Sequence, residues 1–192
     1  MLNITIEIYR FILRLVIGTK RTLLVGIMST LYFICLSQAV AAAEVLTDDD
    51  KKRRIDELYE GYKKEFPGVA FFSADQTMQV MSRIKMILVD IREPEEQEVS
   101  MIDGAITERE FFGNYSIYQN HIVVAYCTIG SRSGKFVQKL SKKGISSFNL
   151  SGGILAWLHA GGAVHRDGTR VKRVHVYGKK WDLAPSTIET VW

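Results

Sequence analysis

Residues 122–133 of this chain read IVVAYCTIGSRS, an apolar run that ends in a cysteine and continues as a short polar loop. The run 122–126 predicts a buried strand, and residues 134–143 have the spacing of an amphipathic helix. Cys127 is therefore expected at the carboxyl end of a strand, in a loop that leads into a helix N-terminus. The free N–H groups of such a loop favour a thiolate or an attached anion. The sequence thus predicts a reactive thiol that the rest of the chain supports.

Strands and helices alternate on both sides of this loop. Residues 85–90 are a second apolar run, which ends in Asp90, and residues 145–150 are a third, which ends at the Gly152–Gly153 turn. Such alternation predicts an α/β fold with an open, mainly parallel sheet flanked by helices. Ligands of these sheets bind at the carboxyl ends of the strands. We therefore expect Asp90, Cys127 and the Gly152–Gly153 turn to lie on one face.

Three further segments surround this core. Residues 47–65 predict a helix with an acidic first turn and one apolar face. The aromatic stretch 108–120 shows no clear period and predicts a long irregular loop. Residues 169–192 predict a β-hairpin with its turn at Gly178, followed by a tail. We interpret this last segment as a structural flap or an interaction surface.

The first 43 residues are typical of a targeting segment. Residues 22–40 carry no charge and follow Lys20 and Arg21, and small residues at Ala41 and Ala43 offer cleavage sites. We predict a signal peptide. The alternative is an uncleaved membrane anchor formed by residues 22–40. Either interpretation places the functional domain outside the cytoplasm, in the periplasm or another extracytoplasmic space.

Charge and cysteine content narrow the function classes. The chain has a net charge of +4, of which residues 1–43 hold +3, so the remainder offers no clustered basic face for nucleic acid. Cys35 lies in the leader, which leaves Cys127 without an intramolecular disulfide partner after processing. His165 and His175 have no Cys or His partner at metal-ligand spacing, so neither a metal nor another cofactor is predicted.

Four ordered segments resemble the rhodanese (thiosulfate sulfurtransferase) family. They are LVDIREPEE at 88–96, DGAI at 103–106, CTIGSRS at 127–133 and SGGILAW at 151–157. The resemblance implies a domain at 67–162, preceded by the leader at 1–43 and a helix at 44–66, and followed by a hairpin and tail at 163–192.

The resemblance also implies a function. The thiolate of Cys127 would take a sulfane sulfur from thiosulfate, a persulfide or a polysulfide, hold it as a persulfide, and pass it to a thiol, of a protein or a small molecule, or to cyanide. The expected substrate-binding residues are Thr128, Ile129, Gly130, Ser131, Arg132 and Ser133. Asp90 and Arg92 are the expected supporting residues.

Loop length separates two chemistries within this resemblance. Six residues run from Cys127 to Arg132, which goes with sulfur transfer, whereas related cell-cycle phosphatases have one residue more. Thr128 is neutral where many members have a basic residue, which favours a persulfide or polysulfide donor over thiosulfate. We expect Arg132 either to tie the loop to Asp90 or Glu93 or to meet the substrate.

Two other functions remain open at this point. In the first, the fold is a catalytically weak binding module that acts through protein–protein interaction, with residues 163–192 as the partner surface and Cys127 as a relic. The second and weaker one is phosphatase or arsenate-type chemistry on the same loop. The short loop argues against it.

Overall fold

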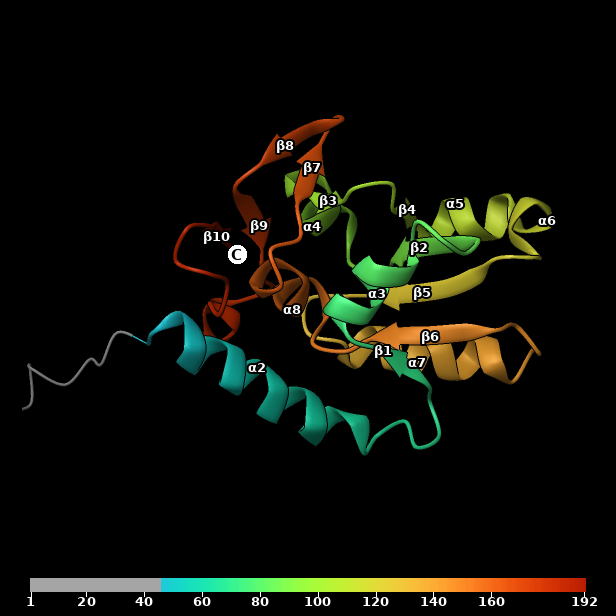
Figure 1. The fold of residues 1–192 in the computed structure, drawn as a ribbon, viewed down its shortest axis with the longest axis horizontal. Coiled ribbons are helices and arrows are strands. Elements are labelled where there is room, and N and C mark those ends of the chain that lie inside the picture. The colour runs from blue at the N-terminus through green and yellow to red at the C-terminus, as the bar shows by residue number, and fades with distance from the viewer. Residues whose placement is uncertain (1–45) are drawn as a thin grey trace, which may run out of the picture. The chain divides into compact units, whose positions relative to one another are not determined.

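The computed structural model describes residues 46–192, which contain a five-stranded sheet at their centre (Figure 1). The strand order is β1-β6-β5-β2-β4, and every neighbouring pair is parallel. These strands are β1 (Phe71–Phe72), β2 (Met86–Asp90), β4 (Ile106–Thr107), β5 (Ile122–Tyr126) and β6 (Ser147–Leu150). The predicted α/β fold with a mainly parallel sheet is confirmed.

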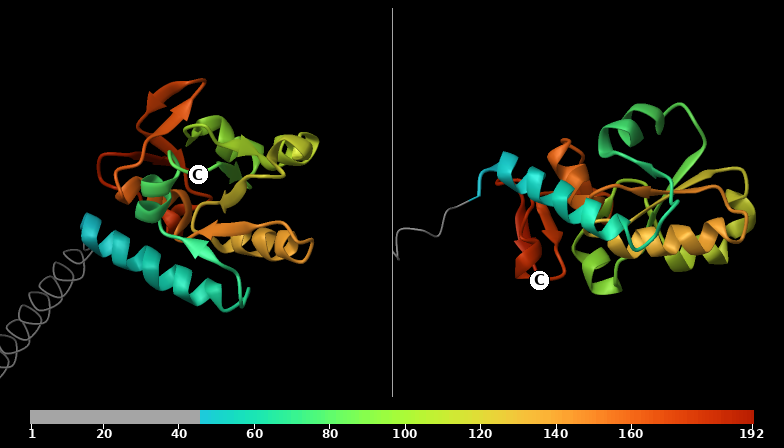
Figure 2. Two further views of the ribbon diagram at one scale, coloured as in Figure 1. Left: turned by 45° about the vertical axis from the view of Figure 1, so that its right-hand side comes forward. Right: turned by 90° about the horizontal axis from the view of Figure 1, so that it is seen from below.

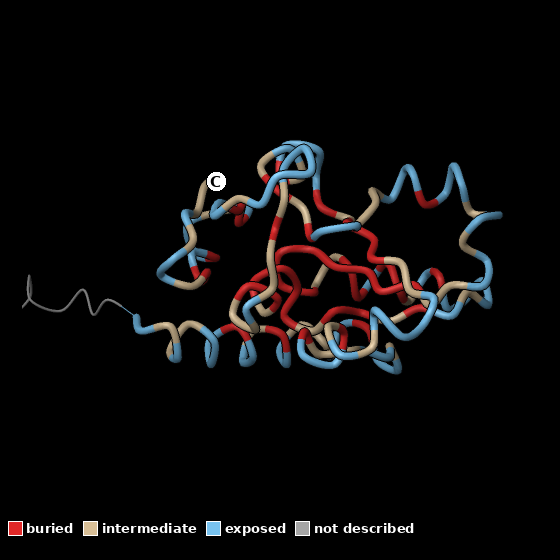
Figure 3. Tube along the Cα trace, turned by 45° about the horizontal axis from the view of Figure 1, so that its top comes forward, coloured by how far each residue is buried: buried red, intermediate tan, exposed pale blue. Residues whose placement is uncertain are grey.

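Alternate residues of the central strands pack into two separate apolar clusters. Leu88 and Val124 belong to one cluster, and Val89, Val123 and Ala125 belong to the other. This alternation follows from the strand geometry, which points successive side chains to opposite faces. Both faces of the sheet are therefore covered, and the most deeply buried parts of the chain run through its centre (Figure 3).

Helices form a layer on each face of the sheet (Figure 2). The first cluster contains side chains of α3 (Ala74–Val80) and α8 (Gly153–His159), and the second contains side chains of α5 (Glu108–Gly113) and α7 (Ser131–Ser141). The parallel strands β2 and β5 therefore have their carboxyl ends on the same side of the sheet, and the loops that follow them lie there together.

Local capping signals explain where several helices begin. Thr47 and Asp50 form a capping box at the start of α2 (Asp48–Lys63), and Ser73 and Gln76 form the same motif before α3. Pro94 occupies the first turn of α4 (Pro94–Val99), where its missing N–H costs nothing. The helix predicted over 47–65 is thus present.

The aromatic stretch 108–120 is not the irregular loop that its composition predicts. It contains α5 and a short helix, α6 (Tyr115–Tyr118). Thr107 and Glu110 form a capping box that starts α5, and Phe111 is fully buried against the sheet. The aromatic residues belong to two short helices that are separated at Asn114, where the backbone is not helical. This interruption obscured the helical period.

The C-terminal hairpin has its turn at a different place from the predicted one. Strands β7 (Val164–Arg166) and β8 (Thr169–Val171) are antiparallel, and β7 also pairs with β3 (Met101–Ile102). Asp167 and Gly168 form the turn, both with positive φ, as a two-residue hairpin turn requires. The prediction of a turn at Gly178 was therefore wrong.

Gly178 instead precedes a short 3₁₀ helix, η1 (Lys179–Trp181). The last strands, β9 (Arg173–His175) and β10 (Glu189–Val191), pair in parallel around it. The segment then packs beside the start of α2 (Figure 1), where the backbone N–H and hydroxyl of Ser186 donate to the Asp48 carboxylate. The two flanking segments are thus joined to each other.

Within residues 46–192, no helix combines the length and the apolar character needed to cross a bilayer. The predicted leader, residues 1–43, lies outside the described residues, and Cys35 lies with it. The signal-peptide and anchor interpretations therefore stay predictions.

Candidate active site

Cys127 directly follows β5 and is 1% exposed. Its Sγ accepts a hydrogen bond from the backbone N–H of Gly130 at 3.2 Å and one from the Ser133 hydroxyl at 3.6 Å. Gly130 has φ +93, and α7 begins at the next residue. This left-handed conformation, which glycine adopts at little cost, turns the loop back so that its amide faces the sulfur. Of the free N–H groups that the sequence predicted around the sulfur, that of Gly130 thus faces it.

The turn between β6 and α8 holds the cysteine loop from behind. The N–H of Ile154 donates to the Cys127 carbonyl at 2.9 Å, and that of Leu155 donates to the Thr128 carbonyl at 3.3 Å. Gly153 has φ +58, and a Cβ there would overlap both of those carbonyl oxygens. The sequence-based expectation that this turn and Cys127 lie together is met, and the contact is backbone against backbone.

A second support comes from β6 and α2. The side-chain amide of Asn149 donates to the Gly130 carbonyl at 2.8 Å and to the Tyr59 hydroxyl at 3.2 Å. Burial raises the pKa of Tyr59 to about 12, so this hydroxyl stays neutral at physiological pH. The Tyr59 ring also lies against Gly130, where an added Cβ would be 2.8 Å from the ring. Helix α2 therefore helps to fix the loop.

Arg132 is held by a carboxylate rather than left free. Its guanidinium donates to both carboxylate oxygens of Glu96, at 2.6 and 2.9 Å, and to the Thr128 hydroxyl at 3.1 Å. The Thr128 hydroxyl in turn donates to Glu96 at 3.0 Å. Arg132 therefore ties the loop as one of its predicted roles requires, but its partner is Glu96 and not Asp90 or Glu93.

The electrostatics of this group follow from its burial. Burial would raise the pKa of Glu96, but hydrogen bonds from Arg132 and from the backbone N–H of Glu93 outweigh it, so that pKa lies below its ordinary value of 4.5. Burial would lower the pKa of Arg132, whereas the hydrogen bonds to Glu96 and the charge of a Cys127 thiolate raise it. Arg132 thus carries a permanent charge, most of which Glu96 balances.

Replacing Glu96 with glutamine tests this bracing role through pH. The lowered pKa means that the Glu96 carboxylate stabilises the fold above about pH 4.5, and that this stabilisation is lost as the pH falls through the lower pKa of the folded protein. We expect Glu96→Gln to lower the free energy of unfolding by about 1–3 kcal/mol at neutral pH. Its stability should also depend less on pH between about pH 3 and pH 5.

Urea unfolding at a series of pH values measures both effects. Glu95→Gln is the matched control, because Glu95 lies in the same helix and is exposed. It should keep the pH dependence of the wild type. If the free energy of unfolding of Glu96→Gln changed with pH as steeply as that of the wild type, the bracing role of the Glu96 carboxylate would be contradicted.

The predicted supporting residues, Asp90 and Arg92, form an ion pair whose side chains are 0% exposed. Arg92 Nη2 donates to Asp90 at 2.7 Å and to the Ser100 carbonyl at 2.6 Å, and its guanidinium lies 5.8 Å from the centre of the Tyr126 ring. Tyr126, the residue before the cysteine, accepts a hydrogen bond from the Ile102 N–H. Asp90 and Arg92 are therefore buried beneath the site, and neither lines the pocket that opens over the Cys127 sulfur.

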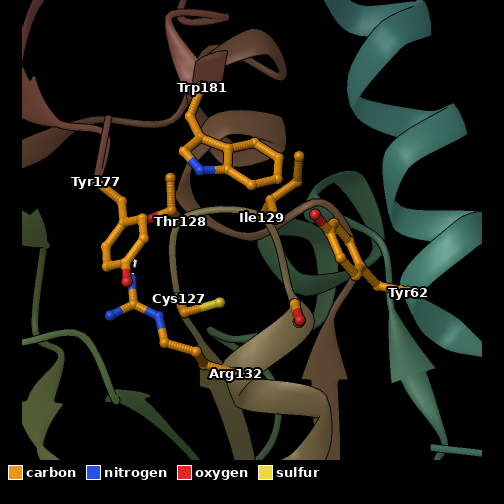
Figure 4. Close-up of a pocket in the computed structure, with 8 residues that line it drawn as sticks. Tyr62, Cys127, Thr128, Ile129, Arg132, Tyr177 and Trp181 are labelled. Atoms are coloured by element: carbon orange, nitrogen blue, oxygen red, sulfur yellow. Dashed lines mark hydrogen bonds between the residues drawn. The ribbon is translucent and has the colours of Figure 1, made fainter. Parts of the chain in front are cut away.

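A pocket of about 160 Å³ opens over the sulfur (Figure 4). Five of its lining residues come from the loop and the start of α7, namely Cys127, Thr128, Ile129, Ser131 and Arg132. Of the predicted substrate-binding residues, Gly130 and Ser133 donate to the sulfur but do not line this space.

Three lining residues lie outside the predicted domain and were missed from the sequence. They are Tyr62 of α2, Tyr177 and Trp181, which together we call the aromatic wall. Figure 4 shows their rings around the space into which the Cys127 sulfur points. The only sequence signal for these three pocket residues was the aromatic content of the flanking segments, which does not show which part of the molecule the side chains face.

Tyr177 has an unusual backbone and an unusual neighbour. Its φ is +65, a conformation that costs a bulky residue about 1–2 kcal/mol. Its ring lies over the Arg132 guanidinium, 5.0 Å from ring centre to Cζ, although 62% of Tyr177 is exposed. The strain therefore places an aromatic ring on the charged side chain of the pocket.

No group of three or more His, Cys, Asp or Glu side chains within residues 46–192 is placed to hold a metal ion. The chemistry that this part of the chain offers is that of a buried thiol with two hydrogen-bond donors on its sulfur, next to a braced arginine.

Comparison with known proteins gives partial matches. Two curated relatives, each named "Probable adenylyltransferase/sulfurtransferase MoeZ" and from two strains of Mycobacterium tuberculosis, are 36% identical over 81 residues, which cover 38% of this chain and 20% of each relative. The chain thus spans about a fifth of the length of these relatives.

Solved structures are similar over about half of the chain. A thiosulfate sulfurtransferase from Pseudomonas aeruginosa is 21% identical with a TM-score of 0.49, over 60% of this chain and 23% of that one. A rhodanese-like domain protein from Staphylococcus aureus is 26% identical with a TM-score of 0.42, over 54% of this chain and 99% of that one.

The region that matches a protein family contains most of the sheet and the cysteine loop. The family model described as "Rhodanese-like domain" matches residues 73–160, inside the region 67–162 expected from the four motifs. These residues include the sheet strands β2, β4, β5 and β6, the cysteine loop and the turn that holds it. Residues 73–160 of this chain therefore form a rhodanese-like domain.

Proposed function

We propose that this chain is a sulfurtransferase that carries a sulfane sulfur as a persulfide on Cys127. The observation that carries the proposal is the placement of the Cys127 sulfur at the base of a pocket, with the Gly130 N–H and the Ser133 hydroxyl directed at it. The rhodanese-like domain and the sulfurtransferase names of the relatives from M. tuberculosis support it.

The reaction has two steps. In the first, the Cys127 thiolate attacks the outer sulfur of the donor, a new S–S bond forms on the cysteine, and the donor's own bond to that sulfur breaks, with the electron pair leaving on the donor remnant. In the second, an acceptor thiolate or cyanide attacks the outer sulfur of the persulfide, and Cys127 leaves as the thiolate. No net oxidation occurs, because the sulfane sulfur only changes partners.

The chain's own residues have separate parts in these steps. Gly130 and Ser133 donate hydrogen bonds to the cysteine sulfur. Arg132 adds a positive charge at the pocket and is held in place by Glu96. Burial of the sulfur excludes water and unspecific oxidants from the persulfide.

We further propose that the protein acts outside the cytoplasm. The support is the leader at residues 1–43, interpreted as a signal peptide or as an anchor through residues 22–40. The intact mass of the protein purified from an exporting host distinguishes the two, because cleavage after Ala41 or Ala43 removes the whole apolar segment. A mature cytoplasmic protein that keeps residue 1 would contradict export.

Intact mass spectrometry of the full-length chain tests the sulfur-carrier proposal. After incubation with thiosulfate or inorganic polysulfide, we expect Cys127 to gain roughly 32 Da for each added sulfur. The adduct should be absent from Cys127→Ser. Cys35→Ser is the matched control, because it removes the other cysteine and should load like the wild type.

Two outcomes would overturn the proposal. One is the absence of any adduct on the wild type with either donor. The other is an adduct that persists in Cys127→Ser and disappears in Cys35→Ser, which would place the reactive thiol in the leader.

A further inference from the structure

The segments that flank the rhodanese-like domain build the pocket over Cys127, and this bears on which donor fits. We propose that the pocket selects an organic persulfide with an apolar substituent of about the size of a benzene ring, in preference to the doubly charged thiosulfate ion. The inference rests on the proposed function and names its substrate class.

The first argument is the character of the walls. Tyr62, Trp181 and Ile129 present apolar surface to the pocket, and Ile129 is only 3% exposed. The rings of Tyr62 and Trp181 lie 5.9 Å apart from centre to centre, so they form a continuous surface. Burial of apolar area on such a surface is the main source of affinity for an apolar group.

The second argument is the balance of charge. Arg132 is the one charged side chain among the described residues that line the pocket. Both carboxylate oxygens of Glu96 already accept hydrogen bonds from it, and the Tyr177 ring covers its guanidinium. A dianion that entered this space would lose water and meet one guanidinium whose charge Glu96 already balances, which disfavours it relative to an apolar group.

The third argument is that specific contacts hold the walls of the pocket in place. Tyr177 has a left-handed backbone conformation, and its ring lies on Arg132. The Asp48–Ser186 hydrogen bonds and that from Lys51 to the Ala184 carbonyl, at 2.9 Å, join the segment that carries Trp181 to the helix that carries Tyr62. Contacts between the two ends of the described chain therefore fix the aromatic wall over the sulfur.

The size of the pocket sets the size of the substituent. Its volume is about 160 Å³. An apolar cavity of about 150 Å³ in another protein is large enough to bind benzene. A ring or a short branched chain therefore fills the space.

The chemical step for such a donor is balanced. The Cys127 thiolate attacks the terminal sulfur of R–S–SH, the Sγ–S bond forms, and the bond between the two donor sulfurs breaks. The leaving thiolate R–S⁻ takes the bonding electron pair, and the proton stays on the transferred sulfur. The apolar group R stays in the pocket until R–S⁻ departs.

A pair of stable probes separates the two donor classes. Benzenethiosulfonate and thiosulfate both present a terminal sulfane sulfur on an oxidised sulfur, but in the first a phenyl ring replaces one oxyanion. The rate of sulfur loading on Cys127 of the full-length chain is measured for each by intact mass. The ratio of the two rates is then compared between proteins, so that the intrinsic reactivity of the probes cancels.

We expect Trp181→Ala to lower the ratio of benzenethiosulfonate to thiosulfate loading by at least about tenfold. Since Trp181 also belongs to the apolar core, Tyr62→Ala is the second variant, because Tyr62 is only half-buried, and it should shift the ratio in the same direction. Trp192→Ala is the control, because Trp192 is exposed and does not line the pocket.

The outcomes distinguish this inference from the proposed function. Sulfur loading from both probes with a ratio unchanged in Trp181→Ala and Tyr62→Ala would overturn the inference and leave the sulfur-carrier function standing. No loading of the wild type by either probe, or by polysulfide, would overturn both. A ratio that falls equally in Trp192→Ala would also overturn the inference.

Discussion

Replacing Gly153 with alanine is expected to abolish sulfur loading on Cys127 and to lower the free energy of unfolding by about 2–5 kcal/mol. Gly153 has φ +58, and a Cβ there would overlap the carbonyl oxygens of Cys127 and Thr128. Those oxygens are backbone atoms, which cannot move aside as the end of a flexible side chain can. The loop must therefore shift, and the Gly130 amide would lose its alignment on the sulfur.

Gly161→Ala is the matched control for this substitution. Gly161 also has a positive φ, +84, but a Cβ there has nothing within 4 Å. Its replacement should cost only the backbone strain, about 1–2 kcal/mol, and should leave sulfur loading intact. Urea unfolding and the mass assay measure the two effects. Normal loading by Gly153→Ala would show that the loop tolerates displacement.

Asp90→Asn is the second substitution for which we expect a large effect. The Asp90 and Arg92 side chains are both 0% exposed, so the change leaves a buried guanidinium without its counter-charge. Removal of one partner of a buried pair costs about 3–5 kcal/mol, because the remaining charge is uncompensated. The free energy of unfolding from urea titration at neutral pH measures this.

An exposed pair in the same protein gives the comparison. Arg54 and Glu57 form an ion pair on α2, with side chains 57% and 56% exposed. Glu57→Gln should change the stability by less than about 0.5 kcal/mol, because water screens such pairs. If the two substitutions cost the same, burial does not determine the strength of the Asp90–Arg92 pair.

The centre of this fold could be predicted because its signals are local. The apolar run before Cys127, the glycine that turns the loop and the helix that follows all lie within a few residues of one another. The meeting of Asp90, Cys127 and the Gly152–Gly153 turn at one edge followed from the geometry of a parallel sheet. Gly130 and Ser133 were therefore named as site residues, but for substrate binding, whereas the structure shows them donating to the sulfur.

Two of the errors also concern local signals, which other features concealed. The Thr107 and Glu110 pair is a capping box, but the aromatic residues after it hid the helical period. Asp167-Gly168 is a typical hairpin turn, but the prediction placed the turn at Gly178, which follows apolar residues interleaved with basic ones. Both sites carried enough information in the sequence to be assigned.

The aromatic wall is a different kind of omission. Tyr62 and Trp181 meet only because the two ends of the described chain dock on each other, through contacts such as Asp48 with Ser186. The parallel pairing of β9 with β10 depends on the same docking. No local pattern reports contacts of this range, so the walls of the pocket needed the three-dimensional structure.

This docking also affects how a binding-module function can be tested. Deletion of residues 169–192 would remove five buried core residues, namely Val174, Val176, Trp181, Leu183 and Ala184. Loss of a partner after such a deletion would therefore report loss of the core. Single substitutions of exposed residues, such as Trp192, test for a partner surface without that effect.

The hydrogen bonds between Asp48 and Ser186 join positions 138 residues apart, and this has a consequence for synthesis. The chain is made from its N-terminus, so Cys127 is made before Tyr177 and Trp181, which line the pocket over it. The pocket over its sulfur is complete only when Tyr177 and Trp181 have been made and their segment has docked on α2. On the proposal above, selectivity for the donor thus arises only when the C-terminal segment is complete.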